Sequence, residues 1–69
     1  MKQHAEIVKY ALPRIKEGGY VVIYWCDMFG WSYLPCPTEI TMINTYAHFK
    51  NREATVYIKR NGNLEKVKV

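Results

Sequence analysis

The side chains able to bind a metal ion or to act as a nucleophile are few and far apart in this chain. The two cysteines, Cys26 and Cys36, are separated in sequence, and the two histidines, His4 and His48, each stand alone. Structural zinc sites usually take ligand pairs about two to four residues apart, because one tight turn then aims both at the same ion. A cysteine nucleophile needs a base and an orienting group beside it, and no local motif supplies them. The sequence therefore predicts no metal site, no cofactor and no catalytic residue.

Length and composition indicate the class of protein. A chain of 69 residues forms one small domain, here 1–69, and domains of this size bury only about 60% of their unfolded surface. Such a scaffold leaves little room for a ligand cleft, so we expect a non-catalytic binding protein and not an enzyme. Hydrophobic residues make up 49% of the chain, which argues against disorder.

The sequence also indicates a compartment. The longest apolar run, Tyr20 to Cys26, is far shorter than the roughly 20 residues that span a bilayer. Residues 1–17 are charged and lack the apolar stretch of a secretory signal. We therefore expect a cytoplasmic protein without membrane contact, and reduced cysteines follow from that compartment.

Basic residues that could contact a nucleic acid gather in residues 50–69. Residues 1–49 hold four basic and four acidic residues, whereas residues 50–69 hold six basic and two acidic, so the net charge of +4 lies at this end. Lysines attract phosphates, and a tyrosine ring gives a base a surface to stack on. We expect DNA or RNA to bind a C-terminal β-hairpin through Tyr57, Lys59, Arg60, Lys66 and Lys68. The alternative is a solvated sheet face whose lysines keep an edge strand from aggregating.

A second candidate surface is segment 27–37, DMFGWSYLPCP, which we interpret as an aromatic loop. Aromatic and thioether side chains of this kind anchor many protein interfaces. The segment favours a protein-interaction or adaptor protein, or a homodimerising accessory protein such as viruses and mobile elements encode, with an interface at Phe29, Trp31 and Tyr33. The alternative is that Phe29 and Trp31 fold back over the preceding strand as part of the core.

The elements that position these side chains begin with an N-terminal helix. An apolar stripe at helical spacing is formed by Ala5, Val8, Leu12 and Ile15, with Ile7 and Ala11 beside it. Pro13 removes a helical hydrogen bond, so the helix either kinks there or ends at Leu12. The glycines at 18 and 19 then stop it. Residues 20–26 follow as an unbroken apolar run, which predicts a strand buried on both faces.

Residues 38–49, TEITMINTYAHF, allow two interpretations. Their β-branched content and alternation favour a strand, which we expect here. The alternative is a helix capped by Thr38, with an apolar side formed by Ile40, Ile43 and Ala47.

Residues 54–69 predict a β-hairpin, because Asn61-Gly62 supplies the two positive-φ residues of a type I′ turn. In that register Arg60 pairs with Asn63, Ile58 with Glu65 and Val56 with Val67. The expected core side holds Ala54, Val56, Ile58, Val67 and Val69, and the expected outer side holds Thr55, Tyr57, Lys59, Leu64, Lys66 and Lys68.

These elements predict an α+β fold: an N-terminal helix packed on a small, mainly antiparallel sheet of three to four strands that ends in the β-hairpin. The expected order is α-β-β-β-β or α-β-α-β-β. One helix covers one face of strand 20–26, so the other face needs the aromatic loop or a second subunit. A homodimer is therefore expected.

Overall fold

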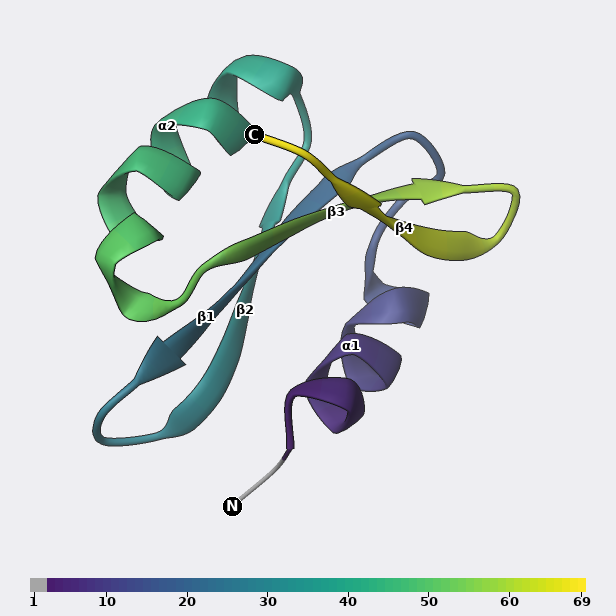
Figure 1. Ribbon diagram of the computed structural model, residues 1–69. Helices are drawn as coiled ribbons and strands as arrows, with labels where there is room; N and C mark the ends of the chain where they lie inside the picture. Colours follow the sequence, from purple (N-terminus) through teal and green to yellow (C-terminus); the bar gives the residue numbers. More distant parts are fainter. Residues whose placement is uncertain (1–2) are drawn as a thin grey trace.

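The computed structural model describes residues 3–69 and has the element order α-β-β-α-β-β (Figure 1). Helix α1 spans His4–Ala11 and runs into the 3₁₀ turn Leu12–Arg14, and strands β1 and β2 span Tyr20–Cys26 and Gly30–Cys36. Helix α2 spans Glu39–Phe49 and runs into the 3₁₀ turn Lys50–Arg52, and strands β3 and β4 span Thr55–Arg60 and Asn63–Val67. The predicted α+β fold is confirmed, but neither expected order of elements is observed, because residues 30–36 form a strand and residues 39–49 form a helix.

The four strands form one antiparallel sheet in the order β2-β1-β3-β4. β1 pairs with β2 along its whole length, from Tyr20 opposite Cys36 to Cys26 opposite Gly30. The ladder between β1 and β3 continues past β1, because the N–H of Gly18 donates to the Lys59 carbonyl at 2.8 Å. β1 and β3 are therefore the central strands, and β2 and β4 are the edges.

One helix lies on each face of this sheet, which runs between α1 and α2 in Figure 1. Side chains of β1 alternate between the two faces, as strand geometry requires. Val21 and Ile23 pack in a cluster with the α1 side, Val22 packs in a second cluster with Met42 of α2, and all three β1 side chains are fully buried. The predicted burial of this strand on both faces is confirmed. The second face of β1 was expected to be covered by an aromatic loop or by a second subunit, and α2 covers it instead. A homodimer is therefore no longer required by an uncovered face of β1.

The N-terminal helix is confirmed, but its buried stripe is centred one position away from the predicted one. The buried side chains of α1 are Ile7 and Ala11, whereas Ala5 is exposed, and Ile15 is buried just beyond the helix. The α-helix ends at Ala11, before Pro13, and a 3₁₀ turn containing Pro13 follows. This agrees with the tendency of proline to end an α-helix.

The strand predicted over residues 38–49 is wrong, since these residues form α2. The alternative cap is confirmed: Thr38 Oγ1 accepts from the Thr41 N–H at 3.2 Å, and Thr41 Oγ1 accepts from the Thr38 N–H at 3.1 Å. These two bonds satisfy backbone groups that a helix start leaves unpaired. The β-branched content of residues 38–49 favoured a strand. These residues form a helix because packing against the second face of β1 outweighs their local strand propensity.

The apolar side suggested for a helix at 38–49 is also wrong. Ile40 is 73% exposed and Ile43 is 51% exposed. The side facing the sheet carries Met42, which is buried, Tyr46, which packs on the same cluster, and Phe49, which stacks on Tyr24 with ring centroids 4.0 Å apart. The spacing of Met42, Tyr46 and Phe49 is the helical signal that was available in the sequence.

The aromatic loop predicted over residues 27–37 is wrong as well. Only Asp27–Phe29 form a turn, and Gly30–Cys36 form strand β2. Pro35 argued against a strand here, because proline cannot donate to a ladder. It is accommodated because β2 is an edge strand, where a missing donor is tolerated.

We predict that Met42→Ala lowers the free energy of unfolding by about 2–5 kcal/mol, because it leaves a cavity between α2 and the sheet. Ile40→Ala, at an exposed position of the same helix, should change it by less than about 0.5 kcal/mol. Urea unfolding followed by circular dichroism measures both changes. Equal effects of the two substitutions would contradict the assignment of the buried face, and Met42→Leu controls for loss of folding.

Candidate binding surfaces

The hairpin formed by β3 and β4 has the predicted register. Arg60 pairs with Asn63, Ile58 with Glu65 and Val56 with Val67. Asn61 and Gly62 have φ values of 54° and 79°, as a type I′ turn requires. The backbone that was expected to present the basic residues is therefore confirmed.

The side of this hairpin that was expected to face outward is partly a core side. Tyr57 and Leu64 pack against the cluster that contains Ile7 and Val21, under α1. The Tyr57 ring centroid lies 6.2 Å from that of His4, and burial raises the pKa of the Tyr57 phenol above its usual value. The ring of Tyr57 is thus half-buried against this cluster and does not offer a fully open stacking surface.

The four predicted basic residues lie in different surroundings. Lys59 is half-buried and its Nζ donates to the Leu12 carbonyl at 3.0 Å. Arg60 lies on the opposite side of β3, where its Nη1 is 3.7 Å from Glu65 Oε1. Lys66, opposite Tyr57 on β4, and Lys68 are both exposed. The structure brings Lys59 and Lys66 to one side of the hairpin, and leaves Arg60 on the other.

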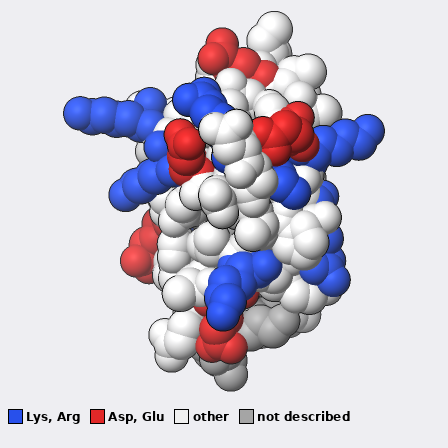
Figure 2. Space-filling view, turned by 90° about the vertical axis from the view of Figure 1, so that its right-hand side faces the viewer, with Lys and Arg blue, Asp and Glu red and all other residues white. Residues whose placement is uncertain are grey.

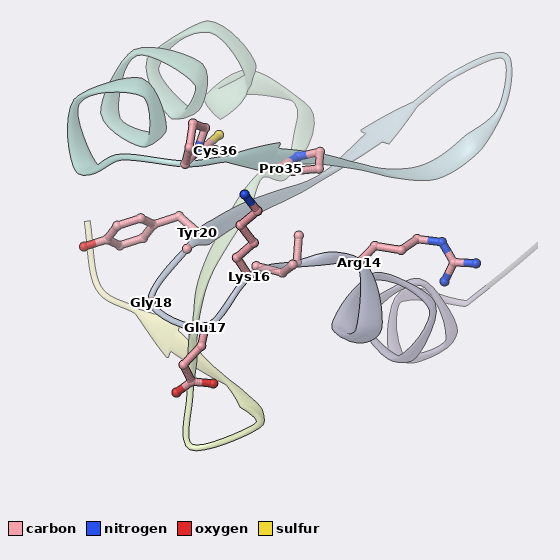
Figure 3. Close-up of a pocket in the computed structure, with 10 residues that line it drawn as sticks. Arg14, Lys16, Glu17, Gly18, Tyr20, Pro35 and Cys36 are labelled. Atoms are coloured by element: carbon pink, nitrogen blue, oxygen red, sulfur yellow. The ribbon is translucent and has the colours of Figure 1, made fainter.

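The turn of this hairpin is held by a residue that the sequence did not reveal. Both carboxylate oxygens of Glu17 accept backbone hydrogen bonds, from the Asn61 N–H at 2.5 Å and from the Gly62 N–H at 3.1 Å. In Figure 3 the Glu17 side chain points toward this hairpin. The partners are 44 and 45 residues away in sequence, so no local pattern could have linked them.

The charge of the face that carries α1 is mixed. Figure 2 shows Lys and Arg side chains interspersed with Asp and Glu side chains over this side of the molecule. This arrangement differs from the single basic stripe that is typical of nucleic-acid-binding domains.

The turn between β1 and β2, which we call the hairpin tip, comprises Asp27, Met28 and Phe29. Met28 is 84% exposed and Phe29 is 77% exposed. The tip extends away from both helices, at the lower left of Figure 1. It is the most exposed group of large apolar side chains in the part of the chain that the structure describes.

Two tryptophans lie directly behind the hairpin tip. Trp25 and Trp31 pair across the strands with ring centroids 5.4 Å apart, edge to face, and Trp25 Nε1 donates to Asp27 Oδ1 at 3.1 Å. Trp31 also packs edge to face against His4 at 4.8 Å. Trp31 and Tyr33 are partly buried and pack against the core cluster under α1, so of the three predicted interface residues Phe29 is the one that is largely exposed.

At the other end of β2 the surface has a hollow of about 380 Å³. It lies between the segment that precedes β1 and the end of β2, and its walls include Ile15, Lys16, Tyr20, Pro35 and Pro37. Figure 3 shows Lys16 pointing toward Pro35 and Cys36, whereas Arg14 extends away from the hollow. No sequence pattern predicted this hollow, because segments distant along the chain form it.

The remaining reactive side chains do not come together. Cys26 and Cys36 are free thiols at opposite ends of the β1–β2 hairpin, and Cys36 is buried with its Sγ 3.5 Å from the Leu34 carbonyl oxygen. Within residues 3–69, no three His, Cys, Asp or Glu side chains are grouped as metal ligands. No helix in that range is long and apolar enough to cross a bilayer.

No protein-family model, curated protein or solved structure matches this chain.

The partly buried phenol of Tyr57 gives a pH-dependent prediction. Its pKa is raised in the folded chain, so above about pH 10 the unfolded state loses this proton first, and the free energy of unfolding falls as pH rises. Tyr57→Phe removes this contribution. Between about pH 9 and pH 11 the variant should lose less stability to urea than the wild type. Identical losses in the two proteins would show that the packing of Tyr57 does not raise the pKa of its phenol.

Proposed function

We propose that this chain is a non-catalytic protein-interaction module that binds its partner through the hairpin tip. The observation that carries the proposal is the exposure of Met28 and Phe29, 84% and 77%, in a protein whose size makes large apolar side chains valuable for its core. An aromatic ring beside a flexible thioether is typical of anchors at protein interfaces.

The structure behind the hairpin tip supports this role. The tip closes a seven-residue strand pair, and the Trp25–Trp31 contact and the Trp25–Asp27 hydrogen bond hold its base. Binding through a turn that is already ordered costs little conformational entropy. The tip therefore combines exposed apolar area with a fixed backbone.

A pull-down with the tagged chain from a lysate of its source organism tests this function. A partner retained by the wild type should bind Phe29→Ser about 30-fold more weakly, as expected for loss of an interface anchor worth about 2 kcal/mol. Ile43→Ser is the matched control, because it also removes an exposed apolar side chain, from α2, and should bind normally. A partner set that is the same for all three proteins would refute the role of the hairpin tip.

A second candidate function is nucleic-acid binding through the β3–β4 hairpin. It is favoured by the exposure of Lys66 and Lys68 next to Lys59, in a region that holds the net charge of the chain. In this function the lysines contact phosphates. Because Tyr57 packs under α1, its ring has less surface for a base to stack on than the sequence suggested.

Salt-dependent binding to DNA or RNA tests the second function. We expect the variant with both Lys66→Gln and Lys68→Gln to bind duplex DNA more weakly and to reduce the slope of log affinity against log salt by about 1.8, at about 0.9 per lost phosphate contact. Lys9→Gln, at an exposed position of α1, should leave both values unchanged. Absence of wild-type binding to DNA and RNA at low salt would exclude this function.

A further inference from the structure

We infer that the partner of the hairpin tip is a second copy of this chain, which pairs along the free edge of β2 in a two-fold antiparallel arrangement. The inference rests on the proposed function, since it uses the same exposed tip. Three features of β2 and its two ends support it: an uncharged edge, an exposed apolar tip at one end and a hollow at the other.

The first feature is the composition of the edge strand. β2, GWSYLPC, contains no Lys, Arg, Asp or Glu, whereas the other edge strand, β4, contains Glu65 and Lys66. Proteins usually protect exposed edges with charges, because unpaired N–H and C=O groups attract another strand. Pro35 is the one such protection within β2, and it lies near the end of the strand. An uncharged edge meets an identical edge without repulsion, so β2 fits a second copy.

The second feature is that the hairpin tip and the hollow lie at opposite ends of β2. An antiparallel two-fold axis brings opposite ends of the two strands together. If the axis passes Tyr33, residue 29 lies opposite residue 37 of the other copy. If it passes Ser32, residue 29 lies opposite residue 35. Adjacent strands are about 4.8 Å apart, so in both registers Phe29 arrives beside a proline that lines the partner copy's hollow.

This arrangement fills two hollows with two tips. Phe29 and Met28 are too exposed to contribute to their own core, and the hollow of about 380 Å³ has apolar walls at Ile15, Pro35 and Pro37. A parallel copy would place tip against tip and leave both hollows open. Only the antiparallel arrangement buries each exposed group in a complementary surface.

The third feature is charge. Asp27 belongs to the hairpin tip, and Lys16 points into the hollow (Figure 3). Glu17, which also borders the hollow, has both carboxylate oxygens engaged by the β3–β4 turn. The antiparallel pairing therefore brings an acidic tip to a basic hollow at both ends of the interface, which favours this orientation.

Analytical ultracentrifugation of the purified full chain tests the inference. We expect the wild type to approach twice the monomer mass of 8.2 kDa as its concentration is raised. Phe29→Lys should weaken the dimer at least about 30-fold, since it removes the anchor and places an ammonium group beside Lys16. Ile43→Lys is the control and should dimerise like the wild type, because Ile43 lies beside Val69, next to the other edge of the sheet. Circular dichroism confirms that both variants are folded.

A charge exchange tests the orientation of the two copies. Asp27→Lys and Lys16→Asp should each weaken the dimer about tenfold, because each places like charges together at both ends of the interface. The variant with both changes should regain the wild-type affinity. Residues 16 and 27 lie at opposite ends of the β1–β2 hairpin within one chain, so this recovery can arise only between copies.

The outcomes separate this inference from the proposed function. A monomeric wild type at about 1 mM, or a dimer that Phe29→Lys does not weaken, overturns the inference. If a different protein then binds in a Phe29-dependent manner, the proposed function stands without it. If neither self-association nor any partner depends on Phe29, both are wrong.

Discussion

The burial of β1 on both faces is the constraint on which the rest of this structure depends. Val21, Val22 and Ile23 are consecutive and fully buried, so each face of the sheet must be covered by a helix. In this chain of 69 residues, both helices of the described part are needed to cover the two faces of β1. It also explains why residues of high strand propensity between 38 and 49 form α2: a fifth strand would have left Val22, Met42 and Val56 without a common core.

Local patterns in the sequence were sufficient for several elements. The apolar run 20–26 predicted β1 with its observed bounds, and Asn61-Gly62 predicted both the turn and the register of β3 and β4. These predictions succeeded because the deciding residues are neighbours in sequence. Segment 27–37 was misread because Pro35 is tolerated only on an edge strand, and edge position is a property of the complete sheet.

The candidate surfaces were less predictable than the fold. All three predicted interface residues are aromatic, namely Phe29, Trp31 and Tyr33. Only Phe29 is largely exposed, because the side chains of the other two lie on the face of β2 that packs under α1. Tyr57 and Lys59 were expected on an open face, but α1 and the turn after it occupy that face. In a very small domain almost every large side chain has a packing role, so residue type alone does not distinguish a binding group from a core group.

The way the two hairpins meet has a consequence for how the chain folds. β1–β2 and β3–β4 each close through a short turn, whereas β1 and β3 join only after α2 and its connections have been bridged. Closing a long segment costs more entropy than closing a short one. We therefore expect the two hairpins to form early as local units, and their docking to limit the folding rate. The hydrogen bonds from the β3–β4 turn to the Glu17 carboxylate then form when the two hairpins dock.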